Sequence, residues 1–545
     1  MRAILSIYII VSYILILILS TALAIEPIDN NDFILAKKSL EDGFYEIAAR
    51  SFEKFISENP HDMDILEAQL LLGESLVHLS RFNDATERID AVVNSKEAAH
   101  FKDEAIYWKA EIYFRTRDFE KAKGLYNKIL TDYASSRYAP YAEYSIARSL
   151  CEEKRYKEAL DAFTLFLSKH PSSELKDEAE LKIGEILYRL KQYEGSYKRL
   201  SGFISENLDP EILSKAYFYI AEDFYYLGDY KDALEYYEKS LAQDKGMGSS
   251  IYAVYGKAWS QLKLHKYEDA IREFERIKAL ENENPIMDSL LFGQAQAFGE
   301  MGNFNKALEN YSLIIEKFPK SKWLVDAYLG KADTLCQLGL YEDGLTTLKQ
   351  AVRIFSSAEN LDEVRYNLAW IYFKINRFAE AIDEFSKIIK GSDNDFYRMS
   401  SYCRIGDAYI QAGQPEKALG VYDLVLKESS VTPEAIFGYV DYAQYQIGRL
   451  LFELERYEGA ILAFQSLLNN YPDSKNAEDA RFGLALSYFK KGDYESSARE
   501  LEDFLRRFKN SKSIIGFSFS NAFILSNSLI ASSYLCSLSW LHAFP

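Results

Sequence analysis

The chain of 545 residues is poor in residues that break regular structure, with only 26 glycines and 11 prolines. This scarcity argues against long disordered or collagen-like segments, and against an all-β fold, which needs many turns. Four cysteines are too few for a disulfide scaffold. Basic residues are outnumbered, with 64 lysines and arginines against 82 acidic residues. We therefore expect no nucleic-acid partner, because phosphate binding depends on clustered basic side chains.

The N-terminus has the pattern of a secretory signal peptide over residues 1–24. A basic start is followed by an uncharged apolar run at 3–19 and then by Ala22-Leu23-Ala24, a small-residue cleavage pattern. The alternative is an uncleaved anchor helix, since the run is near the lower length limit for a bilayer span. The small residues favour cleavage after Ala24, where no cysteine stands to carry a lipid. We expect an exported protein, periplasmic or outer-membrane associated, with a membrane anchor if the signal stays uncleaved.

What the chain has in abundance is an internal repeat. A small residue returns every 37 positions, ten times in succession, and then after 42 and 37 more. This reference column consists of Ala48, Ala85, Ala122, Ala159, Ser196, Ala233, Ala270, Ala307, Gly344, Ala381, Ala418, Ala460 and Ser497. Twelve positions earlier every repeat has Ala or Gly, and four positions later every repeat has a large apolar residue. Such columns, held in phase over most of the chain, define thirteen repeats that determine the architecture.

Each repeat predicts two helices joined by a tight turn, because apolar residues recur at three- and four-residue spacing. The small residues mark places where two helix backbones approach closely, and the aromatic residues fill the gaps between neighbouring pairs. In six repeats a glycine stands where a left-handed residue would end the first helix, namely Gly43, Gly228, Gly302, Gly339, Gly413 and Gly492. Asn376 suits the same position in a seventh repeat.

This pattern resembles the tetratricopeptide repeat (TPR) family. The A-x3-F and final Pro of that family are matched by Ala159, Phe163 and Pro171, and similarly from Ala307 to Pro319. The resemblance implies an all-α fold, an α-α superhelical solenoid of about 13 helix pairs over residues 25–511. The period departs from the family's 34 residues, and the first-helix Trp is mostly absent.

The corners between repeats are similar to those of one subgroup of the family. Corner motifs such as KHPSS, KFPKS and NYPDS, with 37-residue spacing, resemble exported bacterial TPR proteins. These include the Tol-Pal-associated cell-division coordinator and the outer-membrane assembly lipoproteins. Three extra residues per repeat suit a longer helix or an extended corner.

The sequence contains no recognisable catalytic or cofactor motif. The six histidines lack metal-ligand spacing, and no C-x-x-C or phosphate-binding G-x-x-x-x-G-K-[ST] occurs. Cys151, Cys336 and Cys403 fall in different repeats, too far apart in a stack to form a disulfide, and are expected to be buried thiols. We therefore expect no enzyme, no cofactor and no metal.

The family resemblance places the binding groove on the first helices, bordered by columns fifteen and eight positions before the reference column. Tyrosine suits a protein-binding groove because it offers apolar area and a hydroxyl. Uniformly apolar columns are also expected if these side chains only pack against the neighbouring first helix. Trp259 and Trp370 stand between the columns, where other repeats carry charge, and are the better candidates. The candidate residues are Tyr107, Tyr144, Tyr188, Phe218, Tyr225, Tyr255, Trp259, Phe292, Tyr366, Trp370 and Phe373.

Two segments depart from the repeat. The 42-residue step adds a longer corner near 429–437, which is either a hinge or an ordinary longer loop. The segment 512–545 carries no charged residue after Lys512 and is rich in Ser and apolar residues. A degenerate closing helix, a frame error in the gene and a membrane-associating segment all remain open for it.

The expected function is a non-enzymatic protein–protein interaction scaffold in the bacterial cell envelope, binding other proteins or extended peptides. The main alternative is a membrane-anchored factor for outer-membrane assembly or polysaccharide export, attached through either apolar end. An accessory role to a peptidoglycan-cleaving enzyme is a weaker alternative.

Overall fold

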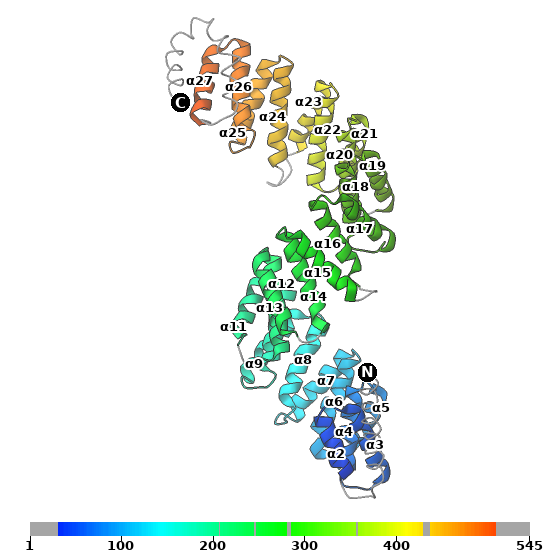
Figure 1. The fold of residues 1–545 in the computed structure, drawn as a ribbon. Coiled ribbons are helices and arrows are strands. Elements are labelled where there is room, and N and C mark those ends of the chain that lie inside the picture. Colours follow the sequence, from blue (N-terminus) through cyan, green and yellow to red (C-terminus); the bar gives the residue numbers. More distant parts are fainter. Residues whose placement is uncertain are drawn as a thin grey trace, which may run out of the picture. The chain divides into compact units, whose positions relative to one another are not determined.

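The computed structural model describes residues 31–205, 208–244, 247–280, 285–355, 358–428 and 437–507. The expected signal peptide, nearly all of the longer corner and the segment 512–545 lie outside these residues. Every regular element in the described ranges is a helix (Figure 1), which confirms the all-α fold.

The chain divides into two compact units, Met1–Lys266 and Tyr267–Pro545. The helices of the N-terminal unit are α2 (Asn31–Glu41), α3 (Tyr45–Glu58), α4 (Ile65–His78), α5 (Phe82–Asn94), the 3₁₀ turn η1 (Ala99–Phe101), α6 (Lys102–Arg115), α7 (Phe119–Asp132), α8 (Ala139–Glu152), α9 (Tyr156–Lys169), α10 (Lys176–Arg189), α11 (Tyr193–Phe203), α12 (Pro210–Leu227), α13 (Tyr230–Gln243) and α14 (Met247–Lys263). The helices of the C-terminal unit are α15 (Tyr267–Leu280), α16 (Met287–Glu300), α17 (Phe304–Lys317), α18 (Leu324–Gln337), α19 (Tyr341–Ile354), α20 (Ala358–Lys374), α21 (Phe378–Gly391), α22 (Asp395–Gln411), α23 (Pro415–Glu428), α24 (Phe437–Glu453), α25 (Tyr457–Asn470), α26 (Ala477–Lys491) and α27 (Tyr494–Arg507).

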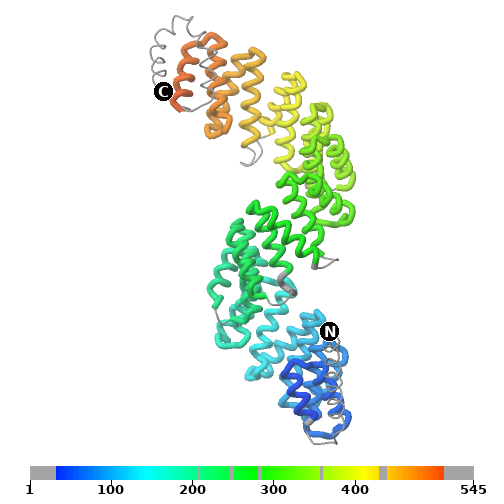
Figure 2. Tube along the Cα trace, in the orientation of Figure 1, coloured from blue at the N-terminus to red at the C-terminus, as the bar shows by residue number. Residues whose placement is uncertain are grey.

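Even-numbered helices are the first helices of the repeats and odd-numbered helices are the second helices, as the sequence period predicts. Within each unit, consecutive helices pack side by side (Figure 2). A typical repeat has a 14-residue first helix such as α6, a turn at 116–118, a 14-residue second helix such as α7 and a corner at 133–138. The seventh repeat contributes α14 to one unit and α15 to the other.

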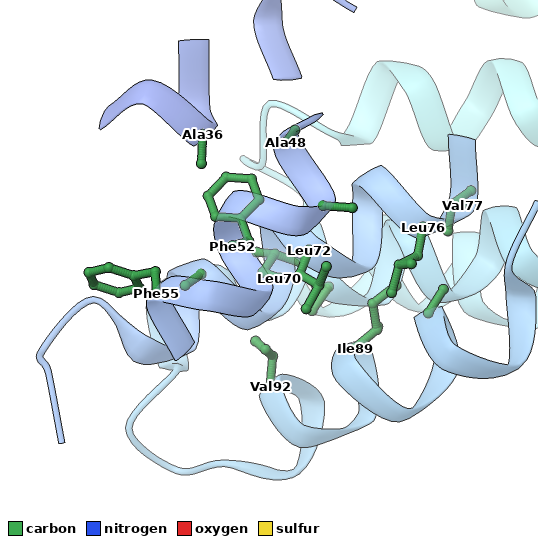
Figure 3. Close-up of a cluster of buried hydrophobic side chains, with 14 of the residues drawn as sticks. Ala36, Ala48, Phe52, Phe55, Leu70, Leu72, Leu76, Val77, Ile89 and Val92 are labelled. Atoms are coloured by element: carbon green, nitrogen blue, oxygen red, sulfur yellow. The ribbon is translucent and has the colours of Figure 1, made fainter. Parts of the chain in front are cut away.

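The small residues of the reference column are buried where the two helices of a repeat meet. Ala48 and Ala85 have no exposed surface. Around them Phe52, Leu72 and Ile89 are also fully buried and form part of the first core cluster (Figure 3). Removing apolar side chains from water in this way stabilises each helix pair and its contact with the next.

The turn between the two helices contains a left-handed residue in every repeat. The six predicted glycines have φ between 69° and 91°, and Asn376 has φ 61°, which confirms the prediction. The structure adds six repeats in which another residue takes this conformation, which is unfavourable for a side chain with a Cβ. These residues, with φ from 59° to 65°, are Ser80, Arg117, Lys154, Lys191, His265 and Glu455.

Serines in the corners tie successive repeats together. Ser136 Oγ donates a hydrogen bond to Asp103 in the preceding first helix at 2.5 Å. Ser321, from the KFPKS corner, donates to Asp288 at 2.6 Å in the same way. These bonds fix each corner against the first helix of its own repeat and so position the next one.

Candidate functional site

The candidate groove residues all lie on first helices, and the structure buries each of them at least in part. Tyr144, Trp259 and Phe292 are buried, with 5–6% of their surface exposed. The other eight are half-buried. A side chain with most of its surface covered by its own chain offers little area to a partner.

The column fifteen positions before the reference column packs against aromatic residues of its own repeat and of the next. The Tyr144 ring contacts Phe163 in the second helix, with ring centroids 5.3 Å apart. Phe292 stacks on Trp323 of the next repeat at 4.4 Å. Tyr366 Oη lies 2.7 Å from Ser400 Oγ, also in the next repeat. Packing between helices therefore accounts for these aromatic residues, and their role in a groove stays a prediction.

The column eight positions before the reference column contacts the first residue of the second helix. Tyr225 meets Tyr230 at 5.4 Å between centroids, and Phe373 meets Phe378 at 5.6 Å. Tyr188 makes the equivalent contact with Tyr193 at 6.0 Å. This contact closes the tight turn in each of these repeats.

The two tryptophans differ in accessibility. Trp259 is 6% exposed and contacts Tyr255 at 6.1 Å between centroids. Trp370 is half-buried, and its ring is parallel to Phe373 at 5.4 Å. The Arg404 guanidinium lies 5.7 Å from the Trp370 ring centroid. Trp370 is therefore the tryptophan that retains a surface for a partner.

The structure shows a polar arrangement that the aromatic columns alone do not predict. In three repeats a carboxylate on the first helix accepts a hydrogen bond from a buried tyrosine on the second helix. Glu111 accepts from Tyr126, Glu222 accepts from Tyr237 at 2.5 Å, and Asp407 accepts from Tyr422 at 2.6 Å. Each tyrosine has no exposed surface. A hydrogen bond to a charged group is the strong kind, and it satisfies a phenol that would otherwise be buried without a partner.

Each carboxylate also accepts a bond from a neighbouring repeat, so the three arrangements connect repeats. Ser145 donates to Glu111 at 3.2 Å, and Tyr442 donates to Asp407 at 2.7 Å. Tyr188 donates to Glu222 at 2.7 Å. We call these three arrangements the acid–tyrosine nodes of Glu111, Glu222 and Asp407.

Burial raises the pKa of the phenol in every node. The pKa of Tyr126 and of Tyr237 lies well above the ordinary value, because desolvation and the adjacent carboxylate both oppose ionisation. The pKa of Tyr422 is raised for the same reasons. The three tyrosines are therefore hydrogen-bond donors at any physiological pH.

The sequence carries a signal for these nodes that appears only when two columns are compared. Four positions after the reference column, the second helix has Tyr in some repeats and Phe in others. The first-helix residue fifteen positions before a Tyr has a side-chain hydrogen-bond acceptor, and the residue fifteen positions before a Phe does not. The acceptors are Glu111, Glu222, Gln296 and Asp407. The residues opposite Phe are Lys37, Arg148, Trp259, Trp370 and Arg449.

An arginine neutralises two of the three nodes. Arg148 lies 3.6 Å from Glu111, and Arg404 lies 2.7 Å from Asp407. No lysine or arginine in the described part of the chain forms an ion pair with Glu222. The Glu222 node therefore keeps an uncompensated negative charge.

Asp223, next to Glu222 on α12, is a second unusual carboxyl group. It has no exposed surface, and neither of its oxygens has a hydrogen-bond partner among the described residues. The nearby Ser196 hydroxyl donates its proton to the Gly184 carbonyl oxygen instead, at 3.0 Å. Desolvation raises the pKa of Asp223 to about 8.

The thiols of the described residues have the properties of buried packing residues. Cys151, Cys336 and Cys403 are free thiols, and burial raises the pKa of Cys151 and Cys403 to about 12. No cluster of His, Cys, Asp and Glu suited to a metal ion occurs in the described ranges. Across those same ranges, every helix is too short or too polar to span a bilayer.

Comparisons with known proteins agree with the helix pairs. Tetratricopeptide repeat models match residues 220–285, 289–321, 323–393 and 403–475, and a tetratricopeptide repeat-like domain model matches 104–247. A model described as outer membrane lipoprotein, YfiO, matches residues 441–519.

Individual relatives are distant. A TPR repeat-containing protein of Methanocaldococcus jannaschii is 24% identical over 256 residues, which are 45% of this chain and 42% of that protein. The match thus spans less than half of that relative. A tetratricopeptide repeat protein structure from Parabacteroides merdae ATCC 43184 has 15% identity and a TM-score of 0.37, and covers 48% of this chain and 96% of that chain. On the repeat models and the thirteen first and second helices, the chain is a member of the tetratricopeptide repeat family.

Proposed function

We propose that this protein is a non-enzymatic scaffold of the cell envelope that binds partner proteins or extended peptides along its first helices. The observation that carries the proposal is the arrangement of the described residues. They form successive helix pairs, and the residues between the pairs are short turns and corners. Within each unit a stack of this kind presents a continuous surface, which is typical of proteins that hold partners.

The envelope location is supported by two features. The N-terminal pattern at 1–24 is that of an export signal. The outer membrane lipoprotein model matches residues 441–519 at the other end of the chain. The same match favours a second candidate function, a factor for outer-membrane assembly that is itself held at a membrane.

Trp370 is the best single residue with which to test the groove, because its surface is only partly covered. We expect Trp370→Ala to reduce the recovery of partners when the purified protein is used to capture proteins from an envelope extract. Lys374→Ala, an exposed position one turn further along α20, is the matched control and is expected to recover partners as the wild type does. Equal recovery with Trp370→Ala and the wild type would remove Trp370 from the binding surface.

Cell fractionation with sequencing of the mature N-terminus separates the two candidates. A soluble protein that begins at Ile25 agrees with a cleaved signal and a periplasmic scaffold. A membrane-bound protein that retains residues 1–24 would favour the anchored assembly factor instead.

A further inference from the structure

The Glu222 node differs from the other two nodes in its missing cation and in an exposed aromatic residue beside it. Tyr226, on the same helix, is 55% exposed. Its ring lies parallel to that of Tyr193, with centroids 5.1 Å apart and 7° between planes. The ring of Tyr188, whose hydroxyl donates to Glu222, has its centroid 5.9 Å from that of Tyr226. An accessible pair of tyrosine rings therefore adjoins an uncompensated carboxylate.

Tyr226 also breaks the sequence pattern of its column. At the position seven before the reference column, the other twelve repeats have only polar or charged residues, namely Glu41, His78, Arg115, Glu152, Arg189, Lys263, Glu300, Gln337, Lys374, Gln411, Glu453 and Lys490. Helix packing therefore does not require an aromatic side chain here. The exposed ring of Tyr226 is therefore available to a partner, and tyrosine is one of the residue types that contribute most to binding.

The Asp407 node shows what the Glu222 node lacks. There the Arg404 guanidinium pairs with Asp407 and lies 5.7 Å from the Trp370 ring and 5.8 Å from the Tyr442 ring. The chain thus already places one guanidinium between aromatic faces and a carboxylate that accepts phenol hydrogen bonds. Tyrosine faces and carboxylates both attract cations, and the two effects add.

The buried Asp223 lies beside the Glu222 node but does not add to its charge. Its carboxyl group lies directly after Glu222 on α12, is fully buried and has no hydrogen-bond partner among the described residues. Because desolvation raises its pKa to about 8, Asp223 is mostly protonated at neutral pH, so Glu222 supplies the negative charge of the site. Of the basic side chains nearby, Arg189 is paired with Glu185 at 3.7 Å.

We propose that Tyr188, Tyr193, Tyr226 and Glu222, the tyrosine–glutamate site, bind an arginine or lysine side chain of an extended segment of a partner protein. The chain's net charge of −18 favours such a basic partner. The proposal rests on the proposed scaffold function and specifies the chemistry of one partner. The partner's cation would supply the positive charge that Arg148 and Arg404 supply at the other two nodes.

The test uses a fluorescein-labelled peptide of repeated Gly-Ser-Arg and an otherwise identical peptide in which citrulline replaces arginine. Citrulline has nearly the shape of arginine and no charge, so the pair isolates the cation. Fluorescence anisotropy with the full mature chain is expected to show at least about tenfold tighter binding of the arginine peptide, equivalent to about 1.4 kcal/mol. Equal binding of the two peptides would overturn the proposal.

Four variants locate the binding. Glu222→Gln and Tyr226→Ala are each expected to weaken binding of the arginine peptide about tenfold, while Tyr226→Phe retains the ring and the affinity. Glu87→Gln removes the same charge from an exposed position on α5 and is expected to leave the affinity within about twofold of wild type. An equal loss with Glu87→Gln and Glu222→Gln would mean that only the net charge attracts the peptide, and the proposal would be wrong. Helical content measured by circular dichroism confirms that each variant is folded.

The failure of this site and the failure of the scaffold function give different results. If the wild type captures envelope proteins and Glu222→Gln captures them equally, the tyrosine–glutamate site is wrong and the scaffold function stands. If the wild type captures none, the scaffold function itself fails. Self-association of the labelled chain, measured by analytical ultracentrifugation and lost in Tyr226→Ala, would assign the site to a second copy and also overturn the proposal.

Discussion

Replacing Gly406 with alanine tests how closely the two helices of a repeat approach at an acid–tyrosine node. A Cβ atom built on Gly406 lies 2.5 Å from Cζ and 2.6 Å from Cε1 of Tyr422, far inside van der Waals contact. The ring has little freedom to retreat. It is fully buried, and its hydroxyl is held by Asp407 at 2.6 Å.

The expected magnitude follows from three contributions. Overpacking a core position costs about 1–3 kcal/mol, and displacing the ring weakens a hydrogen bond to a charged group that is worth about 1.5–3 kcal/mol. Alanine gains about 1 kcal/mol over glycine in helix propensity. We therefore expect Gly406→Ala to destabilise the repeat by about 2 kcal/mol.

Gly420 supplies the matched control in the second helix of the same repeat. A Cβ there has nothing within 4 Å, and the residue is exposed. Gly420→Ala should therefore stabilise the repeat by about 0.5–1 kcal/mol through helix propensity alone. The two substitutions make the same chemical change and are expected to have opposite signs.

Hydrogen–deuterium exchange is the suitable assay, because long repeat arrays do not unfold in a single two-state step. Peptides from α22 and α23 are expected to exchange faster in Gly406→Ala and more slowly in Gly420→Ala. Unchanged or increased protection in Gly406→Ala would refute the close-approach reasoning.

A double variant tests the cause. Where alanine precedes the acid, as in Ala110-Glu111 and Ala221-Glu222, the acid is glutamate, and where glycine precedes it, as in Gly406-Asp407, the acid is aspartate. Glutamate reaches one methylene further and so accepts from a phenol that lies further from the first helix. Gly406→Ala with Asp407→Glu should therefore recover part of the lost protection, and an additive loss would contradict this explanation.

Three further predictions follow from local features. Because the pKa of Asp223 is raised from its ordinary value to about 8, the folded chain retains a proton that the unfolded chain has lost, and stability falls as the pH rises from about 4 to 8. Asp223→Asn should remove this slope and stabilise the N-terminal unit at pH 8 by on the order of 2–4 kcal/mol. The same dependence of melting temperature on pH in Asp223→Asn and the wild type would contradict this prediction. Lys154→Gly, at φ 60°, should stabilise its turn by up to about 1 kcal/mol, while Gly302→Ala, at φ 73°, should destabilise its own turn by a similar amount. Trp259→Ala should lower stability by about 3 kcal/mol or more because the ring is buried, whereas Trp370→Ala should lower it less. Equal denaturation midpoints of the two variants would show that the two rings are equally packed.

The helix pairs and their turns could be predicted from the sequence because every repeat has the same packing requirements. The same residue types therefore recur at the same positions. The reference column needs a small residue wherever two backbones meet, so Ala48 and its equivalents identify the period by themselves. Turn glycines such as Gly302 were predicted because the left-handed conformation favours glycine. Lys154 and Glu455 were not predicted, since the neighbouring helices impose the same conformation there on residues that do not favour it.

The candidate site was harder to predict because a column of aromatic residues is required by packing whether or not a partner binds. Tyr144 and Phe292 belong to such a column, and the structure shows them buried against Phe163 and Trp323. The nodes could not be predicted from any single column. Their signal is a correlation between two columns, because an acceptor stands on the first helix where the second helix has Tyr and not where it has Phe. Tyr226 could not be predicted from apolar columns because its own column is polar in the other twelve repeats.

Three unusual residues lie close together on one helix, and their proximity bears on function. In an array stabilised by contacts between neighbours, an unfavourable residue weakens mainly its own repeat. On α12 the chain has the buried, unpartnered Asp223, the uncompensated Glu222 and the exposed Tyr226 within five consecutive residues. Asp223 lowers stability because it is buried without a hydrogen-bond partner, and Tyr226 leaves more than half of its surface exposed, so folding alone does not explain why these residues stand together. Residues retained against stability are expected where a surface must attract a ligand, and the charge of Glu222 and the aromatic ring of Tyr226 match a single ligand chemistry, that of a cation.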